Sequence, residues 1–390
     1  MKSEKMFTMK FFAICLMIIL SELAIDMYLP TFSNMKEFFA TSYSLVQISL
    51  SVYLLGLGLS PIILGPLSDS IGRKKLIIFL ILIFTLFSFL SIFVINVYLF
   101  IILRFFSGIS AVFATVLATA VLRDSYHGHN LGKAISITSM LWAIIPSIAP
   151  VIGGYVLELG HLWQNIFLLI SIIGVVTLVL VIFFLPETLP ISQQNAFDLY
   201  DKFKQYIDLF TNKKFMSRAL SSALTYSIFT AYITAAPILL RINFNTSAID
   251  IGWLQLVYAA MYIVGTFINS VLISRIGFSK SIVIGKITLL LGAFFLLTLF
   301  VSQNIFSLLI PMMIIQFSIG LIFPNYCALA LMSYERNSGQ GGALLVSIQL
   351  FVCFLASSLV SLIPLGNLSV YALFIMILVI AIMLLSHKEY

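Results

Sequence analysis

Long apolar runs, separated by short polar connections, fill most of this sequence. About twelve runs have the roughly 20 mostly apolar residues that a helix needs to cross the hydrocarbon core of a bilayer. They lie near 8–32, 44–64, 76–95, 98–121, 134–158, 163–185, 215–241, 250–273, 281–301, 305–332, 343–364 and 368–386. One longer polar stretch, Pro186 to Lys214, falls near the middle. The pattern predicts an all-α membrane protein with twelve transmembrane helices, in two six-helix bundles at 1–186 and 215–390 that a central loop at 187–214 connects.

The composition agrees with a lipid environment, and the charge distribution indicates orientation. Hydrophobic residues make up 61% of the chain, charged residues make up 9%, and the mean hydropathy is +1.14. The net charge of +7 could suggest a nucleic-acid partner. However, basic residues gather on one side of the predicted membrane, as at Arg73, Lys74 and Lys75, whereas the other side shows Lys36 and Arg241. By the positive-inside rule we expect both termini in the cytoplasm, and we expect no nucleic-acid partner.

The cysteine and histidine positions give no indication of a metal site or of catalysis. Cys15, Cys327 and Cys353 each lie within an apolar run, and their odd number suggests no disulfide framework. The four histidines all lie in predicted loops, and most loops are too short to build an enzyme site. We therefore expect no enzyme activity and no bound cofactor. A receptor or scaffold that carries no flux is one class of protein that these features leave open.

Two predicted loops resemble each other, which suggests an internal repeat. A shift of 205 residues superposes four positions of the loop between the second and third runs on the loop between the eighth and ninth. The matched pairs are Leu67 and Leu272, Asp69 and Ser274, Gly72 and Gly277, and Lys75 and Lys280. A similar shift brings Pro30 near Pro237. Six helices preserve orientation, so the halves would be parallel repeats with a substrate site near the midplane between them.

The loop from Gly65 to Lys75 resembles the signature of the major facilitator superfamily, which is glycine-x-leucine-x-aspartate-x-x-glycine followed by basic residues. The matching residues are Gly65, Leu67, Asp69, Gly72, Arg73 and Lys74, and Ser70 stands where a basic residue is usual. The resemblance implies the major facilitator fold, with two pseudo-symmetric halves in a chain that works as a monomer. It also implies that Gly65, Asp69, Gly72 and Arg73 form a latch that holds the two halves together in one of the alternating states.

Further strings resemble the Bcr/CflA group of drug:proton antiporters within that superfamily. These strings are Asp26-Met27-Tyr28-Leu29-Pro30, Arg104-Phe105-Phe106-Ser107-Gly108 and the later Arg123-Asp124. In the fifth run Pro150, Gly153 and Gly154 match the antiporter motif, although Ile145 and Ala149 replace expected glycines. The resemblance implies a bacterial inner-membrane protein that exports small amphipathic compounds by alternating access, with the proton gradient as its energy source. A proton-coupled importer of a specific metabolite remains the alternative because of the missing glycines.

A pair of carboxylates, Glu22 and Asp26, lies inside the first apolar run. The spacing of four residues puts both on one face of a helix, and a carboxylate at membrane depth usually marks an ion or substrate pathway. Asp26 lies about six residues, roughly 9 Å, before the outer end of its predicted helix, near Phe32, and Arg104 lies about six residues after the outer end of its own, near Tyr98, so the two are expected at similar depth. Our hypothesis is that Asp26 is the main proton-coupling acid and that Arg104 sets its proton affinity. Glu22 would be a second proton site or the contact for cationic substrates; the alternative is a structural ion pair.

Aromatic and polar residues on several runs could line a substrate cavity. The candidates for substrate binding are Tyr28, Trp142, Tyr232, Gln255, Tyr258 and Asn325. Gln255 and Tyr258 lie on one face of their helix at a spacing of three residues. A mostly apolar cavity with a few polar anchors would suit amphipathic organic molecules. Ordinary packing between helices is the alternative for each of these residues.

Overall fold

The computed structural model describes residues 9–189, 206–333 and 338–386, and within them the regular elements are all helices. Eleven helical segments are long and apolar enough to cross a membrane. One of these, Ala248–Phe300, holds two of the predicted spans, because its backbone leaves the helical conformation at Gly277. The twelve predicted spans are therefore all present in this part of the chain.

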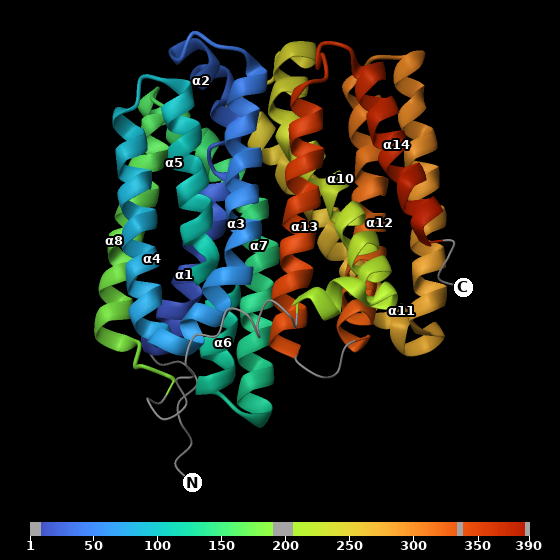
Figure 1. Cartoon of the computed structure of the whole chain (residues 1–390). Helices are drawn as coiled ribbons and strands as arrows, with labels where there is room; N and C mark the ends of the chain where they lie inside the picture. Colours follow the sequence, from blue (N-terminus) through green and yellow to red (C-terminus); the bar gives the residue numbers. More distant parts are fainter. Residues whose placement is uncertain (1–8, 190–205, 334–337, 387–390) are drawn as a thin grey trace.

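The helices form two groups that follow the order of the sequence (Figure 1). The N-half contains α1 (Met9–Asp26), α2 (Phe32–Phe38), α3 (Tyr43–Ile71), α4 (Arg73–Leu90), α5 (Val97–Ser110), α6 (Val116–Ser125), α7 (Gly128–Gly160) and α8 (Gln164–Phe184). The C-half contains α10 (Lys213–Phe244), α11 (Ala248–Leu296), α12 (Ile305–Met332), α13 (Ser338–Ser361) and α14 (Leu368–Ser386). The exact limits of the predicted domains stay predictions, since residues 190–205 of the central loop lie outside the described residues. We call the end that carries Met9 and Gly72 the N-terminal face, and the end that carries α2 the opposite face.

Two of the predicted spans are broken helices rather than continuous ones. The first run was expected to form one helix to about Phe32, but α1 ends at Asp26 and the chain resumes as α2, which reaches Phe38. Pro30 lies in the break, and it can donate no backbone hydrogen bond. The fourth run is likewise split, with a short 3₁₀ turn at Ala111–Phe113 between α5 and α6. Backbone N–H and C=O groups at such breaks become available for other partners.

The repeat inferred from the two loops has a counterpart in the backbone. Gly72, between α3 and α4, has φ of 96°, and Gly277, inside α11, has φ of 80°. Residues with side chains rarely adopt a positive φ, so each turn requires its glycine. The matched glycines therefore make the same sharp turn at equivalent places in the two halves.

A second, closer correspondence lies inside the bundles. In the N-half, α3 and α5 cross so closely that Gly56 meets the Phe105 carbonyl and Gly108 meets the Tyr53 carbonyl. In both cases a β-carbon on the glycine would collide with the facing backbone. Small residues that let two helices approach are typical of helix packing in membranes.

The C-half repeats this crossing between α11 and α12. There Gly265 meets the Phe317 carbonyl, and Gly320 meets the Tyr262 carbonyl. The two crossings use a tyrosine and a glycine three residues later on one helix, with a phenylalanine and a glycine three residues later on the other. The predicted repeat is therefore visible in packing as well as in the loops.

Contacts between the halves are tight toward the opposite face. The Gln47 side chain donates to the Thr234 carbonyl at 2.9 Å, and the hydroxyls of Ser51 and Ser357 lie 2.7 Å apart. Also near the opposite face, but between α7 and α11, a β-carbon on Gly154 would lie 2.7 Å from the Ala248 carbonyl oxygen. Polar and small residues thus close the interface between the halves there.

The side of α7 that carries Gly153 and Gly154 is buried at that level but exposed closer to the N-terminal face of the molecule. Residues 18 apart lie on one side of an α-helix, because 18 residues make about five turns. Gly153 and Gly154 are buried, whereas Ile135 and Ser136, which lie 18 residues earlier, are exposed. On α11, Phe267 lies 18 residues after Ile249, which contacts Gly154, and Phe267 is 70% exposed. Along α7 and α11 the halves are therefore sealed at the opposite face and separate toward the N-terminal face.

Candidate functional site

Asp26 lies at the C-terminal end of α1, where the first span breaks. Its side chain is only 3% exposed, and its Oδ1 atom has no hydrogen-bond partner among the described residues. Glu22 lies one turn earlier on the same helix and is partly exposed. A buried carboxylate oxygen without a partner is costly, so it points to a group that takes up a proton or a ligand.

Arg104, on α5, is enclosed by aromatic rings. It is 1% exposed, and one of its terminal nitrogens donates to the Ala24 carbonyl at 2.9 Å. The guanidinium carbon lies 4.6 Å from the ring centre of Tyr28 and 4.2 Å from that of Tyr53, with Phe167 at 5.8 Å. The faces of these rings favour a cation, and Arg is the residue that stacks on them best. The Nε atom of Arg104 has no partner in the described part of the chain.

Asp26 and Arg104 do not form a direct ion pair in this structure. The ion pairs between described residues that fall within 4.0 Å involve Arg73 instead. Ala24, whose carbonyl accepts from Arg104, lies two residues before Asp26, so the two groups occupy the same region of the N-half. The alternative of a locked structural ion pair is therefore not observed here. The proposed influence of Arg104 on the proton affinity of Asp26 stays a prediction.

The carboxylate pair also lies within electrostatic range of a residue of the C-half. The charges of Glu22 and Asp26 act on the phenol of Tyr226, which lies on α10. Tyr226 belongs to a row of stacked rings, with Phe323 at 5.0 Å and Phe229 at 5.5 Å between ring centres. Both acids thus lie within electrostatic range of an aromatic surface on the other half of the molecule.

The predicted helix motif around Pro150 lies at the junction of three helices. Gly153 packs directly on the Met27 carbonyl at the break in the first span, and a β-carbon there would collide with it. On α11, a β-carbon on Gly252 would lie 2.8 Å from the Pro150 carbonyl oxygen. With Gly154 against Ala248, the motif joins the break beside Asp26 to the interface between the halves. Its residues therefore occupy a position from which movement of the halves would reach the carboxylate.

The predicted latch residues gather on the N-terminal face. Arg73 pairs with Asp124 of α6, with 3.0 Å between Nε and Oδ2, and with Asp69 at 3.5 Å. Gly72 makes the positive-φ turn between them, and Gly65 lies one to two turns earlier, with Val116 of α6 as its neighbour. The structure thus brings Asp69, Gly72 and Arg73 together and adds Asp124.

Glu187, which was not predicted as a site residue, also belongs to this cluster. Its two carboxylate oxygens accept from the backbone N–H groups of Arg73 and Lys74, at 3.0 and 3.1 Å. The next residue, Thr188, donates its hydroxyl proton to Asp124 at 3.1 Å. A carboxylate at the N-terminus of a helix satisfies free N–H groups and complements the helix dipole. The acid directly after the sixth apolar run was the signal that could have revealed it.

Tyr206, in the central loop, connects this region to the C-half. It is 4% exposed and packs in a cluster with Leu209, Phe215 and Leu344 of the C-half and with Ile62 of α3. Burial, together with the nearby charge of Asp69, raises the pKa of Tyr206 to about 12. Tyr206 therefore keeps its proton at neutral pH and lies close to the latch.

The structure divides the predicted substrate-binding residues into different environments. Tyr28 lies in the aromatic enclosure of Arg104, with its hydroxyl 3.2 Å from that of Ser49. The rings of Tyr232 and Tyr258 lie 4.0 Å apart, and both are buried. Trp142, on the open stretch of α7, is 36% exposed. Their contacts with a substrate stay predictions.

Asn325 has protein partners for its amide. It exchanges two hydrogen bonds with Asn269 of α11, at 3.1 and 2.9 Å, and donates to the Leu321 carbonyl. Ser281, beyond the bend at Gly277, also donates to Asn269. This network ties both parts of α11 to α12. The structure therefore favours the packing role for Asn325 over the predicted contact with a substrate.

Gln255, unlike Asn325, has no protein partner for its amide among the described residues. It is 3% exposed, and both its amide nitrogen and its amide oxygen are without a hydrogen-bond partner in the described residues. The hydroxyls of Tyr232 and Tyr258 also have no partner there. Buried polar groups usually have hydrogen-bond partners, so these three side chains remain candidates for contact with a ligand.

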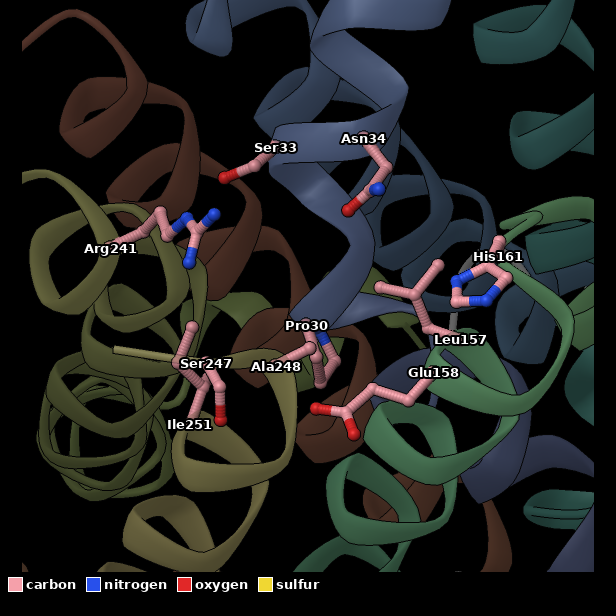
Figure 2. Close-up of a pocket in the computed structure, with 10 residues that line it drawn as sticks. All are labelled: Pro30, Ser33, Asn34, Leu157, Glu158, His161, Arg241, Ser247, Ala248 and Ile251. Atoms are coloured by element: carbon pink, nitrogen blue, oxygen red, sulfur yellow. The ribbon is translucent and has the colours of Figure 1, made fainter. Parts of the chain in front are cut away.

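A pocket of about 280 Å³ opens on the opposite face, above the seal between α7 and α11 (Figure 2). In this view Glu158 and His161 of the N-half lie across the pocket from Arg241 of the C-half. The complete lining is Pro30, Ser33, Asn34, Leu157, Glu158, His161, Arg241, Ser247, Ala248 and Ile251. The predicted substrate-binding residues do not line it. Among the described residues, no cluster of three or more His, Cys, Asp or Glu side chains could hold a metal ion.

The fold and this site agree with one family of known proteins. The family model described as "Major Facilitator Superfamily" matches residues 14–233. The chain belongs to this superfamily, and it is a transporter rather than an enzyme. It is a multi-pass integral membrane protein.

Proteins of similar sequence indicate which group within the superfamily the chain resembles. The chain is 30% identical over 355 residues to an uncharacterized MFS-type transporter, YdgK, of Bacillus subtilis, covering 90% of this chain and 87% of the relative. It is 26% identical to the bicyclomycin resistance protein homolog of Haemophilus influenzae, covering 86% and 85%. It is 28% identical to the chloramphenicol resistance protein CraA of Acinetobacter baumannii, covering 85% and 80%. The predicted Bcr/CflA-type resemblance is therefore confirmed.

Solved structures show the same fold. A crystal structure of a D-xylose-proton symporter matches with a TM-score of 0.79 at 17% identity, covering 96% of both chains. A bacterial homolog of the human lysosomal transporter Spinster, in an inward-facing and unoccupied conformation, matches with a TM-score of 0.75 at 13% identity. That match covers 99% of this chain and 98% of the other. At these identities the likeness establishes the fold alone.

Proposed function

We propose that this transporter exports small amphipathic organic compounds from the bacterial cytoplasm in exchange for protons. Relatives named for resistance to bicyclomycin and to chloramphenicol support export of such compounds. The sealed opposite face and the open stretch of α7 support alternating access. In this proposal the N-terminal face is cytoplasmic, the protein works as a monomer in the inner membrane, and the proton gradient is its energy source.

The observation that carries the proposal is the buried carboxylate of Asp26, which has an unpartnered oxygen beside the break in the first span. A proton-coupled transporter needs an acid whose proton affinity differs between its two conformations. In this proposal Asp26 is that acid, and Gly153 connects the break beside it to the interface that would open. Arg104 supplies a fixed positive charge nearby, and Glu22 supplies a second acid that is partly exposed.

The cluster on the N-terminal face would hold the two halves together in the other state of the cycle, in which the cytoplasmic side is closed. In this structure Asp69 and Arg73 are engaged within the N-half, with Asp124 and Glu187. When the cytoplasmic side closes, the same charges would face the ends of α12 and α13. Tyr206 already packs between this cluster and the C-half.

Transport in vesicles with Asp26→Asn tests the proposal. Everted vesicles that hold the purified protein should accumulate a drug such as chloramphenicol when a proton gradient is applied. Asp26→Asn should abolish gradient-driven accumulation and leave folding intact. Glu37→Gln, an exposed acid on α2, is the matched control and should transport normally. The proposal would be overturned if Asp26→Asn kept full gradient-driven accumulation, or if the unaltered protein carried the drug out of the everted vesicles, which corresponds to import into the cell.

A further inference from the structure

Gln316 occupies the place in the C-half that Arg104 occupies in the N-half. The close crossing of α3 and α5 and that of α11 and α12 superpose Gly108 on Gly320. Arg104 and Gln316 each lie four residues before that glycine, and each is followed by a phenylalanine. The residue that corresponds to Tyr53, which holds Arg104, is Tyr262. The two halves therefore present an arginine and a glutamine at equivalent depth and on equivalent helices.

The Gln316 side chain is buried without being satisfied. It is 1% exposed, and its amide oxygen has no hydrogen-bond partner among the described residues. Gln255, on the helix that α12 crosses, has two further unpartnered atoms. A buried polar group without a partner costs free energy, so a fold keeps one where water or a ligand completes it.

The C-half satisfies another carboxamide on the same helix. Asn325, nine residues after Gln316, has hydrogen bonds to Asn269 and to the Leu321 carbonyl. Asn325 thus has hydrogen-bond partners inside the protein. The amide oxygen of Gln316, on the same helix, does not have one among the described residues.

The regions around Arg104 and Gln316 differ in their charged residues. The N-half site combines Arg104 with Asp26 and Glu22, whereas the described residues from Ile251 to Ser386 include no Asp or Glu. A carboxamide offers both a donor and an acceptor and carries no charge. It therefore suits neutral partners such as amides, carbonyls and hydroxyls. The row of stacked rings that ends at Phe323, two turns along α12, provides apolar surface for the rest of a ligand.

We infer that Gln316 forms a second binding site that holds a neutral hydrogen-bonding group of the substrate. This inference rests on the proposed transport function. The two halves then divide the work: the N-half binds the coupling proton, and the C-half selects the substrate. Gln316 is the specificity-determining residue, and a substitution there changes which compounds bind without changing proton coupling.

The test compares two probes in Gln316→Leu. Chloramphenicol is neutral and carries an amide and hydroxyls, whereas tetraphenylphosphonium is a cation without hydrogen-bonding groups. We expect Gln316→Leu to weaken equilibrium binding of chloramphenicol to the purified protein at least tenfold and to leave tetraphenylphosphonium binding unchanged. Gln303→Leu, at an exposed position before α12, is the matched control and should alter neither.

Stability and coupling separate this inference from a structural role. Leucine removes the buried, unpartnered amide oxygen at nearly constant size, so Gln316→Leu should keep or raise the thermal unfolding temperature. Gradient-driven flux of tetraphenylphosphonium should persist in Gln316→Leu and disappear in Asp26→Asn. The inference is overturned if both probes lose affinity equally, if chloramphenicol binding is unchanged, if the unaltered protein does not bind chloramphenicol, or if the variant unfolds at a lower temperature. If coupled flux is absent from the unaltered protein while the binding difference is found, the proposed function alone is wrong.

Discussion

The α-carbon of Gly153 packs directly on the carbonyl oxygen of Met27, so that α7 touches the first span at its break. This contact lies one residue after Asp26 and one residue before Gly154, which meets Ala248 of the C-half. Two neighbouring glycines thus connect the carboxylate region to the interface between the halves. A movement of α11 against α7 would therefore change the contacts of these two glycines.

Gly153→Ala should damage both stability and transport. Its β-carbon would overlap the Met27 carbonyl oxygen, so either α7 or the break must shift, and overpacking of this kind costs about 1–3 kcal/mol. We expect a lower thermal unfolding temperature in detergent and a lower rate of gradient-driven flux. Gly132→Ala on the same helix is the control, because a β-carbon there meets nothing within 4 Å. Equal behaviour of the two variants would show that the close contact does not matter.

Much of the fold follows from the sequence because a bilayer leaves the backbone few choices. Each apolar run of sufficient length has to be a helix, since lipid offers no hydrogen-bond partners. All twelve runs are found, although α11 joins the eighth and ninth across Gly277. The break after Asp26 was not predicted, because apolar residues continue on both sides of it. The close contact of Gly153 with the Met27 carbonyl, which lies at this break, appears only in the tertiary structure.

The site was predicted in part, and the missing part depends on tertiary contacts. Glu22, Asp26 and Arg104 stand out because ionisable residues are rare inside spans. The ring enclosure of Arg104 depends on Tyr53 from α3, and no local pattern connects these two residues. Glu187 was missed for the same reason, because its partners lie more than 100 residues away. The pairing of Asn325 with Asn269 likewise appears only when α11 and α12 cross.

Arg104→Lys should impair transport although the charge is kept. The planar guanidinium stacks on the rings of Tyr28 and Tyr53, and an ammonium group cannot reproduce this geometry. Loss of the stacked contacts should cost about 1–2 kcal/mol. We expect coupled flux to fall about tenfold, which corresponds to about 1.4 kcal/mol. Arg123→Lys, at an exposed position at the end of α6, should retain full activity, and a similar loss there would indicate a general need for arginine.

Glu187→Gln should loosen the turn between α3 and α4. The glutamine keeps one oxygen acceptor but loses the second oxygen and the charge that face the N-terminus of α4. Loss of a helix cap typically costs about 1 kcal/mol. Hydrogen exchange of the Arg73 and Lys74 amides should therefore be about fivefold faster, as measured by mass spectrometry of the peptide around Gly72. Glu158→Gln, exposed at the far end of α7, should leave these amides unaffected. Unchanged exchange in Glu187→Gln would mean that the cap contributes little in the membrane.

A disulfide between positions 51 and 357 should hold the two halves together and stop transport. The hydroxyl oxygens of Ser51 on α3 and Ser357 on α13 lie 2.7 Å apart, so cysteines at these positions can reach each other. The double variant Ser51→Cys and Ser357→Cys would be made with the native Cys15, Cys327 and Cys353 replaced by alanine, because Cys353 lies one turn from position 357.

Oxidation should abolish flux in this double variant, and a reductant should restore it, because alternating access requires α3 and α13 to separate at this level. Ser51→Cys alone in the same background is the control and should transport under both conditions. Cross-link formation would be quantified by the loss of free thiols in the intact protein. If the cross-link forms completely and flux continues, the interface at Ser51 and Ser357 stays closed throughout the cycle. The moving parts would then have to lie on the other side of the molecule, along α7 and α11.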